Sequence, residues 1–387
     1  MSKLLIAPAT STAEVDEAFH LACAVFSERN AAASYPTYKA MLWREDPAFA
    51  EANIIIGRTA AGELAGIVRI VPRRLHRVDQ TMRVAGISSV CVNPALRGRG
   101  YSVAIMEHAL KHCRSLGYDL SLLIARRAAD HFYTQFGFWG VSSYSRVYIG
   151  VPKSQPGSAT ATLDFPPANA AWIECYAQAY AETYSQSFGW FERSGADWAF
   201  LLKRAGLLPG VDVRTITLDG KPVGYVVAGS GLVHELAFVD ALTADQLVPA
   251  LASYAGTADG SLELALPPEH RLCRSLANFD WSVRFRECSY GGHMLRILNV
   301  DRAADMLGER AARRLGALGC KPLVESVDGV AVRWDGVRSR VELSGQARVR
   351  PGYQQTCVLL GALSLSDARE SVADSALPFN VSFPDQL

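Results

Sequence analysis

The sequence predicts an α/β protein with mixed (α+β) sheets, and three observations support this class. Strand-like and helix-like patterns alternate through residues 1–150, and a second alternating series follows residue 169. The stretch VPKSQPGSATATLDFPPA between them is rich in Pro, Ser and Thr and has no apolar periodicity, as is typical of a linker. The pattern changes again near YGGHMLRILNV. We therefore predict four segments, namely a first domain at 1–152, a linker at 153–168, a second domain at 169–290 and a third at 291–387.

The first domain begins with TAEVDEAFHLACAVFSE, whose apolar residues recur at helical spacing after a Ser/Thr-rich start. Residues 52–76 follow as two strands around a turn at AAGE, and RVAGISSVCVNP is a further strand. The next helix follows Gly100 and keeps Val103, Met106 and Leu110 on one face. YDLSLLIA is the continuous apolar run expected of a strand buried on both faces. AADHFYTQFGF then predicts a short helix that closes on Gly137.

The second and third domains read as further α/β units. In the second, we predict helical structure over 172–206, strands over 213–229 and 232–239, and a helix over 243–256. The third combines a helical pattern at 301–318 with strand-like residues at 329–343 and an apolar run at 356–363.

Composition excludes several classes of function. The net charge of +1 across 387 residues gives no general attraction to nucleic acid, so no nucleic-acid partner is expected. No segment approaches the roughly 18 apolar residues of a membrane span. The eight cysteines are scattered, without metal-site spacing, which predicts reduced thiols in a cytoplasmic protein. His108 and His112 lie four residues apart without a suitable third ligand, so no metal is predicted.

The stretch SSVCVNPALRGRGYSVAIMEHAL, residues 88–110, carries the most specific motif. Arg97-Gly98-Arg99-Gly100 stands between a strand and a helix, where glycines let the backbone approach a ligand and the first helical N–H groups lack internal partners. Such a turn binds phosphate, and arginines extend its reach. The alternative is a tight turn with solvated arginines. The nucleoside triphosphate loop and the dinucleotide fingerprint are both absent.

This segment resembles the pyrophosphate-binding motif of the GNAT acyltransferase superfamily, with Val92-Asn93-Pro94 before the loop. Ser102 replaces the motif's last Gly or Ala, and FYTQFGF matches the family's next signature about thirty residues on. The resemblance implies acetyl-CoA as co-substrate. It also implies that the strand at Val90, Cys91 and Val92 splays from its neighbour, so that its N–H groups polarise the thioester carbonyl. The loop residues implied to bind the cofactor are Arg97, Gly98, Arg99, Gly100, Tyr101, Ser102 and Val103.

The same resemblance places Tyr133 at the general-acid position. A phenol suits this role because it is still protonated at neutral pH. Its alternative role is a packed aromatic. Cys91 could in principle accept the acyl group, but a lone Cys in a strand is more often a core residue, so direct attack in a ternary complex is preferred.

The strand before the loop supplies no base, because VAGISSVCV contains no acidic residue. Asp130 and His131 are candidates beside Tyr133, with helix capping or solvent exposure as the alternative. The order of the domains, with stretches such as RSGADWAFLLKRAG and MLRILNVDRAADML, resembles the Eis-type (enhanced intracellular survival) acetyltransferases. That family implies tandem GNAT-like domains, the second degenerate, and a sterol-carrier-like third domain. It also implies that the α-carboxylate of Leu387 is the base, although chain ends are usually frayed.

Together these features predict an N-acetyltransferase that acts on a primary amine, for which the resemblance suggests an aminoglycoside, a polyamine or a protein lysine. A homo-oligomer is also implied by the family. The rival hypothesis is a non-enzymatic acyl-CoA sensor or apolar-ligand-binding protein that uses the first domain as a scaffold.

Overall fold

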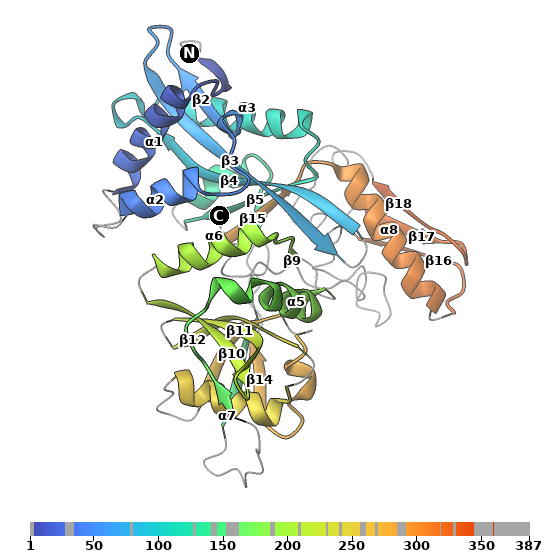
Figure 1. The fold of residues 1–387 in the computed structure, drawn as a ribbon. Helices are drawn as coiled ribbons and strands as arrows, with labels where there is room; N and C mark the ends of the chain where they lie inside the picture. The colour runs from blue at the N-terminus through green and yellow to red at the C-terminus, as the bar shows by residue number, and fades with distance from the viewer. Residues whose placement is uncertain are drawn as a thin grey trace.

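The computed structural model contains two large sheets and one small one, each covered by helices (Figure 1). The structure describes residues 4–27, 35–77, 80–126, 129–140, 145–151, 162–185, 190–207, 210–229, 231–239, 242–255, 261–267, 270–284, 292–317, 319–327, 330–343 and 359. Among these residues, no helix combines the length and the apolar character needed to cross a bilayer.

The strands form three sheets. In spatial order, the first sheet contains β1 (Leu5–Pro8), β2 (Ile54–Arg58), β3 (Leu64–Arg77), β4 (Gln80–Val92), β5 (Leu120–Ala125), β15 (Gly292–Ile297) and β6 (Trp139–Gly140), with β9 (Trp190–Phe191) paired to β3. The second contains β14 (Asp280–Arg284), β7 (Ser145–Gly150), β13 (Ser261–Leu266), β12 (Leu232–Phe238), β11 (Lys221–Gly229), β10 (Val211–Leu218) and β8 (Leu163–Asp164). The third contains β16 (Leu323–Val327), β17 (Val330–Trp334) and β18 (Ser339–Leu343).

Eight α-helices accompany these sheets in the described part of the chain. They are α1 (Thr12–Ser27), α2 (Tyr35–Arg44), α3 (Tyr101–Ser115), α4 (Asp130–Thr134), α5 (Ile173–Tyr184), α6 (Gly195–Gly206), α7 (Ala244–Ala255) and α8 (Val300–Ala317). Short 3₁₀ turns lie at Glu51–Asn53, Pro94–Leu96, Ala170–Trp172 and Cys273–Ser275.

The first sheet is covered on both faces. Val15, Ala18 and Ala22 of α1 pack with Trp43 of α2 on one face, and α3 and α4 pack on the other. Side chains alternate between the faces along each strand, so Ile55 of β2 belongs to the α3 face, whereas its neighbours Ile54 and Ile56 belong to the α1 face. The α3 face carries Val90, Val103 and Tyr133 of the predicted site.

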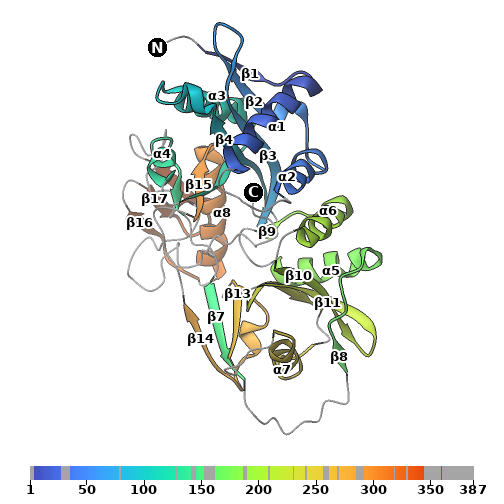
Figure 2. The same ribbon diagram turned by 90° about the vertical axis from the view of Figure 1, so that its left-hand side faces the viewer.

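The two large sheets exchange a strand. The first sheet with α1–α4 is the first unit, and the second sheet with α5–α7 is the second unit. β7 follows the strands of the first unit in the chain but pairs with β13 and β14 in the second sheet. β15 follows the second unit and inserts between β5 and β6 of the first sheet. Figure 2 shows β7 with β13 and β14 in the second sheet. The predicted boundaries at 152 and 290 do not anticipate this exchange, because neither sheet consists of one continuous segment of the chain.

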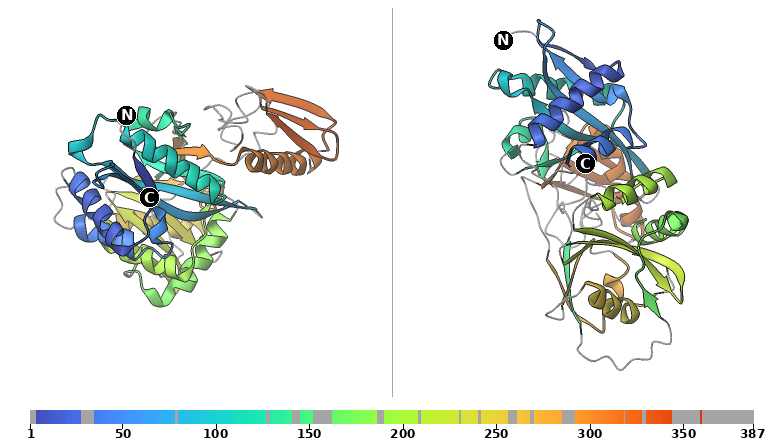
Figure 3. Two further views of the ribbon diagram at one scale, coloured as in Figure 1. Left: turned by 90° about the horizontal axis from the view of Figure 1, so that it is seen from above. Right: turned by 60° about the vertical axis from the view of Figure 1, so that its left-hand side comes forward.

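The third unit, α8 with β16, β17 and β18, stands to one side of the other two (Figure 3). Leu307 and Leu315 of α8 pack with Val332 of β17, and the same apolar cluster includes Leu75 of β3 and Leu120 of β5. The third unit is therefore joined to the first sheet through a shared core.

Most predicted elements of the first domain are confirmed, including α1, the β2–β3 hairpin, α3, β5 and α4. The helical pattern predicted over 172–206 is wrong in its middle. It divides into α5 and α6, and between them β9 pairs with β3 of the first sheet. A two-residue strand carries too little pattern to be seen in the sequence. The run at 356–363 lies outside the described residues except for Leu359, which is buried in the shared core.

Candidate active site

The Arg-Gly loop has the conformation that its glycines allow. β4 ends at Val92, the Asn93 side chain accepts a hydrogen bond from the Ala95 N–H, and a 3₁₀ turn leads into the loop. Gly98 and Gly100 have φ values of 78° and 76°, in the left-handed region that residues with a Cβ rarely adopt. α3 starts directly afterwards at Tyr101.

The loop presents donors and cations together. The first helical hydrogen bond runs from the Ala104 N–H to the Gly100 carbonyl, at 3.3 Å, so the N–H groups that precede it have no partner within the helix. Arg97 and Arg99 are exposed, whereas Tyr101 is buried with Leu96 and Ala65 and anchors the loop to the sheet. This arrangement suits an extended anion at the positive end of α3.

β4 separates from β5 next to this loop. The parallel pairing runs from Val84 opposite Leu120 to Ile87 opposite Leu123, and no pairing of β4 with β5 follows within the described residues. An irregularity in the pairing with β3 falls at the same place, and Ser89 there has φ 51°, unusual for a residue with a Cβ. Residues 88–92 thus form an open seam along one edge of β4.

Tyr133 lies beside the seam. It shares an apolar cluster with Val90 of β4 and Val103 of α3, and its ring packs edge-on against Phe132 at 5.1 Å. Its hydroxyl makes no hydrogen bond to any residue that the structure describes, and burial raises the pKa of Tyr133 to about 12. The phenol therefore keeps its proton throughout the neutral range.

Cys91 also lies in the seam, buried toward the α1 face. Burial raises the pKa of its thiol to about 12, so Cys91 is not a thiolate at neutral pH. This supports the preference for direct attack over an acyl-cysteine intermediate.

A buried charged cluster on the α1/α2 face was missed by sequence reasoning. Arg69 and Arg73 of β3 both donate to the carboxylate of Asp46 at 3.0 Å. Although burial alone raises the pKa of Asp46, the charge and hydrogen bonds of Arg73 hold it below its ordinary value. Lys39 of α2 is 8% exposed and donates to the Ser89 hydroxyl at 2.7 Å. One signal was available, since Lys39 precedes Trp43 by four residues and so shares its buried helix face.

The remaining candidates are less well placed. Asp130 begins α4, and His131 is exposed. Leu387 lies outside the residues that the structure describes.

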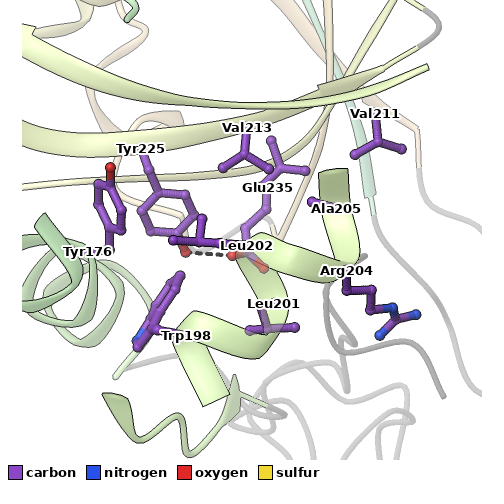
Figure 4. A pocket seen from close by; sticks show the side chains of 11 residues that line it. Tyr176, Trp198, Leu201, Leu202, Arg204, Ala205, Val211, Val213, Tyr225 and Glu235 are labelled. Atoms are coloured by element: carbon purple, nitrogen blue, oxygen red, sulfur yellow. Dashed lines mark hydrogen bonds between the residues drawn. The ribbon is translucent and has the colours of Figure 1, made fainter. Parts of the chain in front are cut away.

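A separate apolar pocket lies in the second unit between α6 and the sheet, with an empty volume of about 480 Å³ that includes space open to solvent (Figure 4). Trp198, Leu202 and Val213 form walls, and the carboxylate of Glu235 lies at its base. Arg193 donates to both oxygens of Glu235, at 2.7 and 2.9 Å, and Tyr225 also donates to it. The carboxylate is therefore already satisfied, and no residue of the loop, the seam or α4 lines this pocket.

Comparisons with known proteins agree with the GNAT resemblance of the first domain. Residues 7–142 match the family model of the acetyltransferase (GNAT) domain. A GCN5-related N-acetyltransferase structure from Anabaena variabilis is similar over 89% of this chain and 86% of its own, with 16% identity and a TM-score of 0.57. The structure of Eis1 from Mycobacterium abscessus is similar over 88% of this chain and 84% of its own, with 17% identity and a TM-score of 0.55. No curated protein sequence matches the chain. The chain therefore carries an acetyltransferase (GNAT) domain at residues 7–142.

Proposed function

We propose that the chain transfers the acetyl group of acetyl-CoA to a primary amine by direct attack in a ternary complex. The observation that supports this most strongly is the open seam of β4 between the glycine loop and Tyr133. In this proposal the pyrophosphate lies at the loop next to the seam, the N–H groups of the seam polarise the carbonyl, and Tyr133 beside the seam donates to the departing sulfur.

The loop is the proposed site of the cofactor's pyrophosphate. Backbone N–H groups of residues 98–103 and the guanidinium groups of Arg97 and Arg99 would bind its oxygens, and the backbone of Val90, Cys91 and Val92 would orient the thioester. Acetyl-CoA supplies the activated acetyl group.

In the proposed reaction the amine nitrogen attacks the thioester carbon, and the C–S bond breaks as the amide forms. A free thiol has a pKa near 8.5, so full proton transfer to the sulfur from a phenol with a pKa of about 12 is uphill. Tyr133 therefore acts as an acid by donating a hydrogen bond to the departing sulfur. The proton that the amine loses passes through a base and finally protonates the departing thiolate, which leaves as the free thiol.

The base is proposed to be the α-carboxylate of Leu387, supported by the resemblance to Eis-type enzymes. Removal of the last four residues tests this assignment. Loss of amine-dependent thiol release, with coenzyme A binding retained, supports the terminal carboxylate, whereas unchanged release moves the role to Asp130, His131 or water.

The proposed second GNAT-like domain is supported by a repeated connection. α3 connects the parallel strands β4 and β5, and α7 connects the parallel strands β12 and β13 in the same way. The junction after β12 reads VDALT, without glycine, which fits a unit that no longer binds a cofactor. A sterol-carrier-like third domain and a homo-oligomer are proposed from the family resemblance. A reduced, cytoplasmic setting is supported by the cysteines, since each one that the structure describes is a free thiol.

The function is tested by measuring thiol release from acetyl-CoA with a panel of amines. We expect release that depends on the amine and saturates with acetyl-CoA. Coenzyme A binding without release for any amine would contradict the enzymatic proposal and favour an acyl-CoA sensor.

A further inference from the structure

Lys39 is a buried cation without a counter-ion among the residues that the structure describes. Its ammonium donates to the Ser89 hydroxyl at 2.7 Å and lies 5.0 Å from the centre of the Phe26 ring. No described carboxylate forms an ion pair with it. An ammonium has three N–H donors, so this one can still donate to a ligand.

The neighbouring charges do not neutralise Lys39. Asp46 is the buried carboxylate of this face, and both of its oxygens accept from Arg73, while Arg69 also donates to it. The described cluster of Lys39, Arg69, Arg73 and Asp46 therefore holds three positive charges and one negative charge. The groups that act on the charge of Lys39 are Arg69 on β3, Cys91 on β4 and Cys23 on α1, and none of them is an anion at neutral pH.

Burial of an unpaired charge is costly, so proteins pair such groups or shift their pKa. Here burial lowers the pKa of Lys39 to about 8, with a smaller contribution from Arg69. At neutral pH most of the ammonium is still protonated, and a ligand anion would supply the missing counter-charge.

The position of Lys39 connects this charge to the proposed reaction. Ser89, its hydrogen-bond partner, lies at the irregularity of β4, immediately before Val90 in the seam. The adjacent Ser88 is only half-buried, and its hydroxyl lies 3.5 Å from that of Ser89. Lys39 reaches this point from the α1/α2 face, whereas Tyr133 lies on the α3 face. A group bound to Lys39 would thus approach the thioester from the side opposite Tyr133.

We propose that Lys39 binds a carboxylate carried by the acceptor close to its reacting amine, so that the substrates are amino acids or similar amino carboxylates. This inference rests on the proposed acetyltransferase function and restricts the class of amine that accepts the acetyl group. Among the described residues of this cluster, Lys39 is the one cation without an ion pair, so a single carboxylate suits it, and the net positive charge of the cluster disfavours polycationic acceptors such as polyamines and aminoglycosides.

The test uses the full chain and compares glycine, alanine, glutamate, lysine and phenylalanine with their amides and with spermidine as acceptors. Lys39→Met removes the charge at similar volume, Lys39→Arg retains it, and Lys111→Met on the exposed face of α3 is the matched control. We expect kcat/KM for at least one amino acid to exceed that for its amide more than tenfold. This preference should disappear in Lys39→Met and persist in Lys39→Arg and Lys111→Met.

A binding measurement separates this inference from the proposed function. Calorimetry with the N-acetylated forms of the same acids and amides should show tighter binding of the acid, dependent on Lys39 and weaker as the pH rises through 8. Lys39-dependent binding without turnover would retain the anion site and reject the enzyme. Turnover in which amides or spermidine react as well as the acids, with Lys39→Met unchanged, would overturn the anion site and retain the enzyme. The absence of both turnover and Lys39-dependent binding would overturn the anion site and the enzyme together.

Discussion

Tyr133 and Lys39 lie on opposite faces of the first sheet, and burial displaces the pKa of each in the direction of its neutral form. For Tyr133 this keeps the hydroxyl proton in place beside the seam. For Lys39 it makes the charge costly until an anion arrives. Burial thus keeps the proton on the Tyr133 hydroxyl, and it makes the charge of Lys39 favour an anionic ligand.

Tyr133→Phe tests the first of these roles. We expect kcat to fall by about 10²-fold or more, because the departing sulfur loses its hydrogen-bond donor, while the KM for acetyl-CoA changes little. Steady-state kinetics measure this, with Tyr148→Phe in the second unit as a control for loss of a partly buried hydroxyl. Equal losses in both variants would contradict a role for the Tyr133 hydroxyl.

Lys39→Met should stabilise the fold at neutral pH. The pKa of Lys39 is lower in the folded chain than in the unfolded chain, so its cost is fully present below about pH 8 and fades as the pH rises toward 10.5. At 1.36 kcal/mol per pKa unit this cost is about 3 kcal/mol. Chemical denaturation at pH 7 and pH 10 should show the variant's advantage shrinking with pH. An advantage that stays constant between the two values would show that Lys39 carries no unpaired charge.

At the scale of elements, the strand, loop and helix of the motif could be predicted because each carries its own local signal. The alternation of β4, the glycines and the apolar face of α3 all lie within residues 83–113. The seam itself was expected from the family resemblance. β9 and the pairing of Asp46 with Arg69 and Arg73 could not be predicted, since they depend on contacts between segments far apart in the sequence. For Lys39 the helical spacing to Trp43 predicts burial, but not the contact with Ser89.

The loop offers a matched pair of glycines for a test. Gly98 and Gly62, in the β2–β3 turn, both have positive φ, and a Cβ at either would meet no atom within 4 Å. Replacement of either by Ala should therefore destabilise the fold by a similar backbone strain of about 1–2 kcal/mol. Only Gly98→Ala should also raise the KM for acetyl-CoA, as measured by initial rates. A similar KM for both variants would remove the loop from the cofactor site.

At the scale of the whole molecule, the strand exchange makes the GNAT domain depend on a distant segment. Met294 and Leu298, in β15 and just after it, pack in the same cluster as Val103 and Tyr133. The family model ends at residue 142, and the first sheet is completed about 150 residues later in the chain. The sequence pattern of a strand does not show which sheet the strand joins, so the sequence predicts domains that are each continuous in the chain.

Met294→Asp tests this dependence. The substitution places an unpaired charge in the core beneath the proposed active site, so we expect a loss of several kcal/mol of stability and of acetyl-CoA binding. Val324→Asp is the control, because Val324 is 58% exposed on the third sheet. Thermal denaturation and coenzyme A titration measure both effects. Normal binding by the Met294 variant would contradict a shared core.

Acetyl transfer at the β4 seam is tested by following the acetyl group itself, with acetyl-CoA labelled in the acetyl carbons and the full chain as catalyst. We expect label to enter an amide of the amine in equal amount to the thiol released, and both to fall together in Tyr133→Phe. Thiol release without labelled amide would identify a thioesterase instead, and the absence of both would contradict acetyl transfer at the β4 seam.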